Sequence, residues 1–543
     1  MVYDRAPLAL SVLALMATCV FSGRLHAFFV RHAGQIGYDD GYILSLGERL
    51  IDGHFLPYVD GCSQRGPVLY WAAALAQLAT GRFGWQGGRL LSIVTTFATL
   101  FSVFAVGIVA KRPAGGALAA VFVAWFVLVG FAPSPGFALT GEGVLSPFAV
   151  ESLLWVTFAV SPGRRTRARR AGLVAAGAFS ALAGFSKQTA LPMILPIALF
   201  GFAGLWTTSE DRKERWIGLG ALAGGFVGTI ALMLLPYAIR GELRAFWYWF
   251  YEYNSQTYMA PYKNVHTVDA FVGFMWDHTF AVAGFAFIVS SAIARPFSRA
   301  KSFPRGFLRA YAEAGVDCTA ALVGLALFVS AVVALRFWPH YFLGVVPFAG
   351  LLVGFRAEEA ISGGGKTGSF LGTLVLLGLV TGFLGFSSEN KLAQFERDAK
   401  RGGWAPLRHE AVCDVIDRFS KPGESLFVWG FNPDLYLTCR RRPATRFLFL
   451  LPVAGTVVPQ WNVVREDLVA RGSREQLIQD LTAANPPVVI DGDSPQWGIS
   501  LTRVPVVRNW VEARYCLQKD RQKTILAGKV GVWVRKDRSD CRC

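Results

Sequence analysis

The chain is poor in charged residues for its length. Only 17% of its 543 residues are charged, whereas 53% are hydrophobic. A soluble domain of this size rarely has such a composition, because its surface must be solvated. The charges are also unbalanced, with 54 basic and 37 acidic residues and a net charge of +17. This composition excludes an ordinary soluble enzyme and indicates a protein whose apolar surface faces lipid.

Several motifs are absent, and each absence removes a class of protein. There is no HExxH, no GxSxG between a strand and a helix, and no repeat of fixed period. The segment Ser362-Gly-Gly-Gly-Lys-Thr367 resembles the end of a phosphate loop, but Ala360 stands where that loop needs glycine. No module mixes basic and aromatic residues as nucleic-acid-binding modules do, so we expect no nucleic-acid partner.

Long apolar runs take the place of these motifs. The first, Leu8 to Val30, is too long for the core of a cleavable signal and lacks a small-residue cleavage site, so we expect it to be a membrane anchor. Eleven such runs are interpreted as spans, and several of them are short for a membrane helix. They lie at 8–30, 86–110, 116–132, 147–160, 172–186, 189–206, 216–239, 270–294, 318–335, 340–355 and 369–386.

The loops between these runs differ in charge. Basic clusters at 111–112, 164–170, 212–215 and 295–309 all fall on one side of an eleven-span topology. Cytoplasmic loops are rich in lysine and arginine, so we expect this side, with the N-terminus, to be cytoplasmic. Arg240 and Arg244 run against the rule. The opposite, extracytoplasmic side carries the uncommon polar residues.

The last part of the chain has a different composition. After Phe386 charges of both signs and short apolar runs predominate. We expect residues 1–386 to form an all-α polytopic membrane domain, and 387–543 to form an extracytoplasmic α/β domain. Ala411 to Phe419 reads as a helix, and 425–429, 487–490 and 530–534 read as strands.

Eight cysteines are present, five of them in this tail. Disulfides form outside the cytoplasm, so one or two bridges are expected, and the sequence does not give their pairing.

Two adjacent carboxylates, Asp39 and Asp40, follow the first apolar run. A carboxylate beside apolar walls can act as a general base toward a hydroxyl, or bind a metal or a substrate hydroxyl. The alternative is that the pair caps the helix expected from Gly41 to Leu50.

The same outer loop continues through Tyr58 and Asp60 to Arg65. Arginine binds phosphate through its planar, two-pronged guanidinium, although an interfacial arginine can equally contact lipid headgroups.

Further polar residues recur in the other outer segments. Glu142, in Leu139-Thr-Gly-Glu-Gly143, is either a second carboxylate of a site or a solvated loop residue, and Glu151 follows in the next span. Lys187, with Gln188, is either a phosphate contact or an interface anchor. Arg336, His340 and Tyr341 lie on one tight turn, either as a phosphate cradle or as part of an aromatic belt.

Together these motifs resemble the GT-C glycosyltransferase superfamily, in its dolichyl-phosphate-mannose–protein mannosyltransferase-like and lipid A aminoarabinose-transferase-like branch. Their order along the chain carries the resemblance. The motif residues are Asp39-Asp40, Gly53, Pro57-Tyr58, Asp60, Arg65-Gly66-Pro67-Val68, Tyr70-Trp71, Thr140-Gly141-Glu142, Lys187-Gln188, Arg336, His340-Tyr341 and, in the tail, Trp429-Gly430, Pro433, Tyr436 and 442–447. Three departures from the family pattern are Asp40 for Glu, Arg65 for Lys, and Gly66 for the first proline.

The resemblance implies transfer of a sugar from a polyprenyl phosphate to a hydroxyl of a lipid, glycan or protein on the outer face. Asp39 would be the general base of an inverting displacement, with Asp40 and Glu142 as further catalytic candidates. Tyr58 and Asp60 would position the acceptor or the loop. A divalent metal ion is an option that the resemblance leaves open. The residues expected to bind the donor phosphate are Arg65, Lys187, Arg336, His340 and Tyr341.

Two other classes of function compete with this interpretation. A multispan transporter would carry charges within its spans and would show paired repeats. A non-catalytic assembly or receptor protein would not need carboxylates and cations gathered in separate outer loops. The sugar, the acceptor and the oligomeric state are not predicted by the sequence.

Overall fold

A computed structural model describes most of the chain. The described residues are 6–32, 38–53, 55–130, 139–209, 211–258, 285–286, 289–294, 296, 298, 305–333, 339–362, 365–400, 409–421, 423–456, 463–493, 499–518, 523–525 and 528–538. They form two compact units, each made of separate stretches of the chain. The first unit comprises 1–29, 92–235 and 266–396, and the second comprises 30–91, 236–265 and 397–543.

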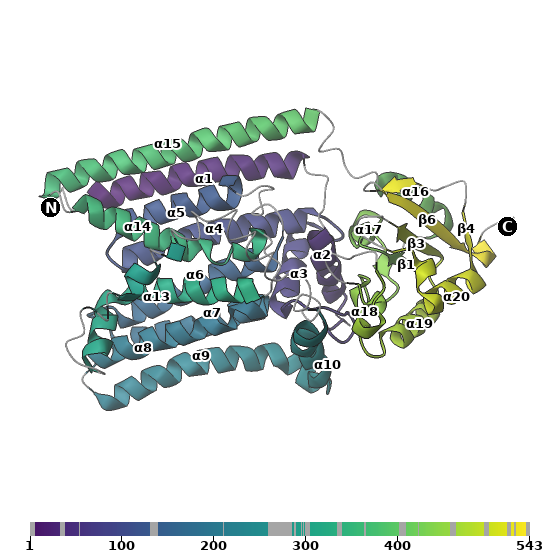
Figure 1. Ribbon diagram of the computed structural model, residues 1–543, viewed down its shortest axis with the longest axis horizontal. Helices are drawn as coiled ribbons and strands as arrows, with labels where there is room; N and C mark the ends of the chain where they lie inside the picture. The colour runs from purple at the N-terminus through teal and green to yellow at the C-terminus, as the bar shows by residue number, and fades with distance from the viewer. Residues whose placement is uncertain are drawn as a thin grey trace. The chain divides into compact units, whose positions relative to one another are not determined.

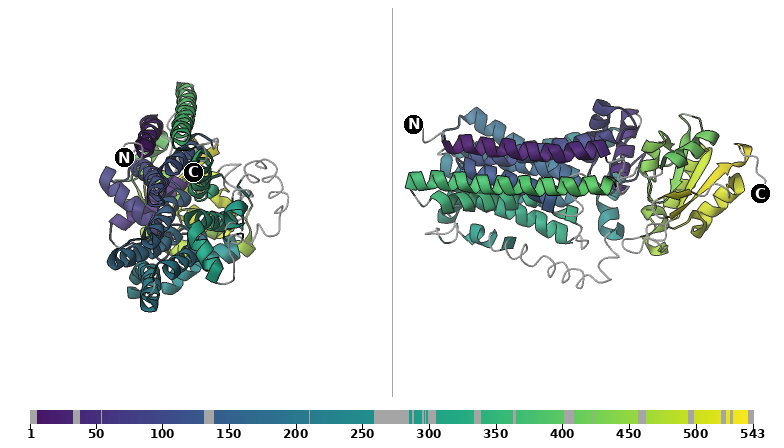
Figure 2. Two further views of the ribbon diagram at one scale, coloured as in Figure 1. Left: turned by 90° about the vertical axis from the view of Figure 1, so that its left-hand side faces the viewer. Right: turned by 90° about the horizontal axis from the view of Figure 1, so that it is seen from above.

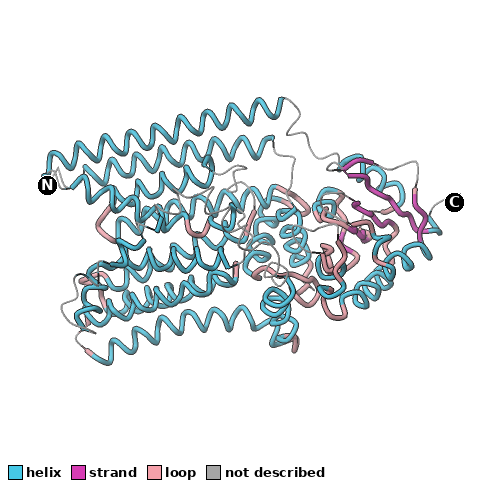
Figure 3. Tube along the Cα trace, in the orientation of Figure 1, coloured by secondary structure: helices cyan, strands magenta, loops and turns pink. Residues whose placement is uncertain are grey.

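Helices make up the first unit almost entirely (Figures 1 and 3). The bounds of its α-helices are α1 (Ala6–His32), α4 (Gln86–Val109), α5 (Pro113–Trp125), α6 (Gly141–Val160), α7 (Thr166–Ser186), α8 (Ile194–Thr208), α9 (Arg212–Ile239), α13 (Arg305–Val333), α14 (Val346–Ser362) and α15 (Gly365–Lys400). A π-helical turn, η1 (Phe126–Gly130), extends α5, and the 3₁₀ segments η3 (Gln188–Met193) and η6 (Pro339–Phe342) precede α8 and α14. Figure 2 shows α1 and α15 side by side, and Arg24 pairs with Glu389 between them.

Seven helices within the described residues are long and apolar enough to cross a membrane. They lie at Leu8–Phe28, Gln86–Val109, Gly141–Val160, Gln188–Thr208, Arg212–Ile239, Leu308–Val333 and Gly372–Gln394, and a shorter apolar helix covers Pro113–Val129. The chain is thus a multi-pass membrane protein, as its composition indicates. The predicted count of eleven is not confirmed. The expected runs at 172–186 and 340–355 fall in α7 and α14, which are not among the seven, and most of 270–294 lies outside the described residues.

Small residues allow the helices of this unit to pack closely. A side chain at Gly354 of α14 would meet the carbonyl oxygen of Gly115 in α5 at 2.1 Å, and one at Gly177 of α7 would meet the carbonyl oxygen of Leu222 in α9 at 2.1 Å. Small residues are typical of helix interfaces in lipid, where backbones approach and dispersion contacts stabilise the pair. We infer that Gly115, Gly177 and Gly354 fix the spacing of this bundle.

The second unit brings residues 30–91 and 236–265 together with the tail of the chain. It contains α2 (Tyr38–Ile51), α3 (Pro67–Thr80), α10 (Leu243–Trp247) and the π-helical segment η4 (Tyr248–Tyr258). Gly41 in α2 permits a close approach, because a side chain there would meet the backbone nitrogen of Asp434 at 2.6 Å. The predicted division at residue 386 therefore differs from the division into compact units, which places 30–91 with the tail.

The tail builds an α/β fold, as predicted. Its strands are β1 (Ser425–Trp429), β2 (Arg442–Pro443), β3 (Val488–Asp493), β4 (Tyr515–Leu517), β5 (Lys523–Ile525) and β6 (Gly528–Arg535). The sheet order is β2-β1-β3-β6-β4, and β5 also pairs with β6. Strand β1 runs parallel to β2 and β3, whereas β6 is antiparallel to its partners.

Helices surround this sheet. They are α16 (His409–Phe419), α17 (Asp434–Thr438), α18 (Leu451–Ala454), α19 (Ser473–Ala484) and α20 (Pro505–Arg514), with 3₁₀ turns at Glu466–Leu468, Leu501–Arg503 and Lys536–Arg538. A disulfide joins Cys413 of α16 to Cys439 after α17, and Cys516 is also disulfide-bonded.

Candidate functional site

The predicted site residues fall into two clusters, one in each compact unit. In the second unit, α2 begins at Tyr38, so that Asp39 and Asp40 both lie in its first turn. The Asp39 carboxylate accepts a hydrogen bond from the guanidinium of Arg65, 26 positions later. That guanidinium also lies over the ring of Tyr42, at 5.2 Å from its centroid. The side chain of Asp39 is 32% exposed.

Asp40 lies in a different environment from its neighbour. It is buried, and one of its carboxylate oxygens would lie 3.8 Å from a side chain built at Gly88 in the first turn of α4. A carboxylate near a helix N-terminus is stabilised by the free backbone N–H groups and by the helix dipole. The position of Asp40 therefore suits a structural role, whereas that of Asp39 suits contact with a ligand.

The loop from residue 55 to 66 is held by a dense set of hydrogen bonds. Tyr58 has a positive φ of 69°, which few non-glycine residues adopt, and its backbone N–H donates to the carbonyl of Gly61 at 2.7 Å. Its buried hydroxyl donates to the carbonyl of Arg65, and burial raises the pKa of Tyr58 well above its ordinary value. Asp60 accepts from the N–H of Leu56 and from Arg240, both at 2.7 Å. Both predicted residues thus hold the loop that presents Arg65.

A tail residue binds the same loop within this unit. Arg446 donates to the carbonyl of Val59 at 3.3 Å, and its own carbonyl accepts from the N–H of Cys62 at 2.9 Å. Its guanidinium also binds both oxygens of Asp480 in α19, and that hydrogen bonding raises the pKa of Arg446. The stretch 442–447, which carried part of the family resemblance, therefore attaches the tail to the 55–66 loop.

In the first unit, the second cluster centres on an ion pair between Glu142 and Lys187. Glu142 was expected either at a site or in a solvated loop. It is neither solvated nor in a loop: it lies in the first turn of α6 and is buried. Thr140 caps this helix by accepting from the N–H of Gly143 at 3.0 Å, which starts α6 six residues before the expected span. Lys187 lies between the end of α7 and η3.

These two residues line one pocket together with a third predicted residue. The ammonium of Lys187 lies 3.9 Å from the centroid of the Tyr341 ring, and all three side chains face a pocket of about 310 Å³, open solvent included. We call it the cation pocket; its other lining residues are Leu145, Thr189, Leu327, Ser330, Ala331 and Gly344. The His340 ring lies edge-on to Tyr341, with 4.7 Å between their centroids. Arg336 lies outside the described residues.

Two further candidates are Glu151 and a metal site. Glu151 accepts a hydrogen bond from Ser102 of α4, so its carboxylate faces a polar partner within the bundle. Among the described residues, no three His, Cys, Asp or Glu side chains gather as metal ligands would. A divalent ion stays an expectation of the family resemblance, without a donor set in the described part of the chain.

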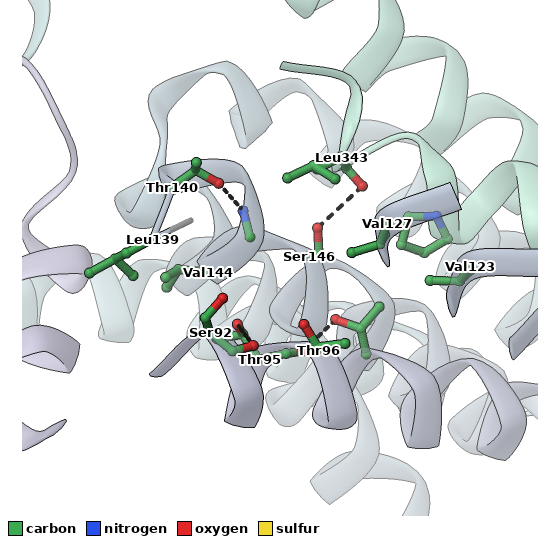
Figure 4. Close-up of a pocket in the computed structure, with 13 residues that line it drawn as sticks. Ser92, Thr95, Thr96, Val123, Val127, Leu139, Thr140, Val144, Ser146 and Leu343 are labelled. Carbon is green, nitrogen blue, oxygen red and sulfur yellow. Dashed lines mark hydrogen bonds between the residues drawn. The ribbon is translucent and has the colours of Figure 1, made fainter. Parts of the chain in front are cut away.

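Sequence reasoning missed several residues that this geometry singles out. Arg240 pairs with Asp60. Its sequence position did give a hint, because it lies against the positive-inside pattern. Arg82, which binds both Glu48 and Asp52 at the end of α2, carried none. A second pocket, described below and drawn in Figure 4, is lined by hydroxyls of α4 and was not predicted either.

Comparisons with known proteins bear on the fold. No family model and no curated protein matches the chain. Among solved structures, ArnT from Cupriavidus metallidurans bound to undecaprenyl phosphate is similar at a TM-score of 0.57, with 14% identity over 96% of this chain and 97% of ArnT. The apo form of the same protein gives 0.52, with the same identity and coverage.

A further neighbour is the oligosaccharyltransferase AglB from Archaeoglobus fulgidus, which gives a TM-score of 0.46, with 12% identity over 98% of this chain and 75% of AglB. The ArnT likeness extends over nearly the whole chain, through the membrane helices and the tail alike. It shows that the chain has the GT-C fold that its sequence motifs predicted.

Proposed function

We propose that this protein is a membrane glycosyltransferase that moves a sugar from a polyprenyl phosphate to a hydroxyl of a lipid, glycan or protein. The observation that carries the proposal is a cation pocket between apolar helices of an ArnT-like fold. Lys187 supplies a positive charge there, and ArnT itself was crystallised with undecaprenyl phosphate. A phosphate on an apolar tail needs this combination, because its charge must be matched where its chain is in lipid.

The phosphate of the donor is bound by cationic and hydrogen-bonding side chains. Lys187 is the first of them, with Tyr341 against its ammonium and His340 beside that ring. Arg65 is the second candidate, because a guanidinium can bind two phosphate oxygens at once. Arg336 stays in the proposal on its sequence motif alone. Glu142 holds the ammonium of Lys187 in place and so positions the donor.

Asp39 is the proposed general base. Its carboxylate is partly exposed and paired with Arg65, whereas Asp40 is buried against the start of α4. In the reaction the acceptor hydroxyl gives its proton to Asp39 while its oxygen attacks the anomeric carbon. The bond from that carbon to the phosphate oxygen breaks, and polyprenyl phosphate leaves. One displacement with one base inverts the configuration at that carbon.

The proposed location of this chemistry is the extracytoplasmic face of the membrane, with the N-terminus in the cytoplasm. Two observations support it. The basic loops predict which side is cytoplasmic, and the disulfide between Cys413 and Cys439 is of a kind that persists in oxidising compartments. The tail, attached to the 55–66 loop through Arg446, would then help to present the acceptor.

The test is transfer by the purified protein in lipid, with a panel of radiolabelled polyprenyl-phosphate sugars and a cell-envelope extract as acceptor source. We expect turnover of one donor, and a loss of roughly 10²- to 10⁴-fold in Asp39→Asn, the range of a general base. Asp467→Asn is the matched control, because Asp467 is also paired with an arginine but lies on the surface of the tail.

Each outcome has a defined meaning. Full activity of Asp39→Asn removes Asp39 as the base. Failure of the wild-type protein to use any donor, with an extract shown to contain acceptors, overturns the transferase and favours transport. An anomeric configuration retained in the product contradicts the single displacement.

A further inference from the structure

A pocket lined by hydroxyl groups lies beside the first turn of α6, within the first compact unit. Four of its residues, Ser92, Thr95, Thr96 and Thr99, lie on α4 at positions i, i+3, i+4 and i+7, and this spacing places them on one face of the helix. Figure 4 shows Ser92, Thr95 and Thr96 across from Thr140 and Ser146 of the α6 segment. The space measures about 460 Å³, open solvent included. We call it the hydroxyl pocket.

The hydrogen bonds within this pocket fix the polarity that it offers. The Thr99 hydroxyl donates to the carbonyl of Thr95 at 2.7 Å, and that of Thr95 to the carbonyl of Ser92 at 3.2 Å. Ser146 donates to the carbonyl of Glu142 at 2.7 Å. The hydroxyls of Thr99 and Ser146 give their protons to the backbone, so their oxygens can act as acceptors toward a ligand. The Thr140 hydroxyl accepts from the N–H of Gly143 and can donate its own proton, so the pocket presents both acceptors and a donor.

The rest of the lining carries no formal charge. Every residue that lines the pocket in the described part of the chain is neutral, and its other walls are apolar; they come mainly from Val123, Val127, Leu139, Val144, Leu343 and Pro347. An anion would be buried among these hydroxyls without a cation to match its charge. A cation would be buried without a counter-ion, which costs more than neutral acceptors return. A neutral molecule with several hydroxyl donors fits both the acceptors and the apolar walls.

The position of the pocket connects it to the proposed reaction. The first turn of α6 separates it from the cation pocket: Thr140, Gly143 and Ser146 line the hydroxyl pocket, whereas Glu142 and Leu145 line the other. The neighbouring residues Leu343 and Gly344 divide between the two pockets in the same way. A phosphate bound at Lys187 thus lies one helical turn from the hydroxyls.

Resting on the proposed function, we infer that the hydroxyl pocket binds the sugar of the donor and selects an uncharged one, with Thr96 and Thr99 as specificity-determining residues.

The test compares donors with their sugarless carrier on the full-length protein in lipid nanodiscs. Thermal stabilisation is measured with undecaprenyl phosphate alone, and with its esters of a neutral hexose, a 4-amino sugar and a uronic acid. We expect the hexose ester to bind roughly tenfold or more tightly than the carrier, and neither charged sugar to add affinity. Thr96→Val and Thr99→Val should each reduce the hexose advantage by about 3- to 10-fold, the range for one hydrogen bond.

A matched control separates recognition from helix packing, because hydroxyls that bond to their own helix also occur in membrane helices without a ligand. Thr157 of α6 donates to the carbonyl of Leu153 at 2.7 Å, as Thr99 does to Thr95, but it does not line the pocket. Thr157→Val should leave the hexose advantage unchanged.

Four results decide the matter. Loss of the hexose advantage in the pocket variants and not in Thr157→Val supports the inference. An equal advantage for a charged sugar overturns it. If the carrier binds but no sugar adds affinity, the hydroxyl pocket does not bind the sugar, and the proposed transferase function is unaffected. No binding of the carrier overturns the proposed function and this inference together.

Discussion

The guanidinium of Arg446 binds both carboxylate oxygens of Asp480, at 2.9 and 3.0 Å, and reaches the carbonyl of Val59, 387 positions earlier in the chain. A bidentate pair of this kind fixes the orientation of the arginine as well as its charge. The 55–66 loop is thereby held, through Val59 and Cys62, in one arrangement with α19. The loop that presents Arg65 depends on a residue of the tail.

Arg446→Ala should therefore lower both stability and transfer. The change removes the loop contact and leaves Asp480, which is 16% exposed, without its cation, at a cost of about 3 kcal/mol in the free energy of unfolding. The control is Arg465→Ala, which breaks a bidentate pair with Asp467 on the surface and should cost less than about 1 kcal/mol. Thermal unfolding and transfer rates of the two variants give the comparison. Equal effects would contradict a special role for Arg446.

The pair of Glu142 and Lys187 allows structure to be separated from function. Either single change, Glu142→Gln or Lys187→Gln, leaves one charge unmatched in a part-buried site and should cost about 3 kcal/mol. The double variant removes both charges, so much of the stability should return. Donor binding should not return with it, because the proposed phosphate contact is gone. The double variant should therefore show a donor KM raised about tenfold or more despite its recovered stability.

The control for this cycle is the exposed pair Arg24 and Glu389, whose side chains are 54% and 47% exposed. Arg24→Gln should change neither stability nor KM appreciably. If the double variant of Glu142 and Lys187 binds donor as the wild-type protein does, the ion pair is structural only.

The sequence predicted local features of this molecule well and pairings poorly. The helix at 41–50, the strand at 425–429 and the α/β character of the tail follow from local patterns, and the structure has them. Glu142 is expected in a loop before the span at 147–160, and its two flanking glycines and Pro147 do disfavour helix there. The cap by Thr140 and burial against the bundle outweigh those propensities.

The contacts of the site join residues that are far apart in the sequence. Glu142 and Lys187 are 45 positions apart, and each was predicted separately as a site residue. Nothing local indicates that the two meet, since an ion pair leaves no periodic pattern. The hydroxyl residues of α4 have helical spacing. Serine and threonine are common in membrane helices without binding anything, so the spacing alone does not indicate a pocket until the neighbouring helix is known. Long-range packing decides both cases.

A buried tyrosine in the second unit predicts loss of stability at high pH. Burial raises the pKa of Tyr70 to about 12, against about 10 for an unfolded chain. Below pH 10 both states are protonated and stability is unaffected. Between pH 10 and 12 the unfolded state loses the proton and the folded state keeps it, so stability falls as pH rises. The loss approaches about 2–3 kcal/mol at pH 12, because a tenfold difference in proton affinity between the two states corresponds to about 1.4 kcal/mol.

Tyr70→Phe should flatten this part of the profile. The variant loses the hydrogen bond between Tyr70 and Ser63, so we expect it to be about 1 kcal/mol less stable at pH 8 but to lose less stability from pH 9 to 12. Tyr251→Phe serves as control, because Tyr251 is 52% exposed. Unfolding midpoints measured across this pH range give the slopes. Parallel profiles for wild type and Tyr70→Phe would show that Tyr70 does not titrate in this window.

The disulfide between Cys413 and Cys439 gives two predictions, one for the stability of the tail and one for the compartment in which the tail lies. It closes a loop with a sequence separation of 26, for which chain entropy gives about 3–4 kcal/mol of stabilisation. Cys413→Ser with Cys439→Ser should lose that amount. If the tail is extracytoplasmic, the bridge is already formed in the cell. Cells are quenched with acid, the free thiols of the protein are blocked, its disulfides are reduced, and the new thiols are labelled with a maleimide polymer. The wild type should then carry two more labels than the double variant. Equal labelling would place the tail in a reducing compartment and overturn the proposed orientation.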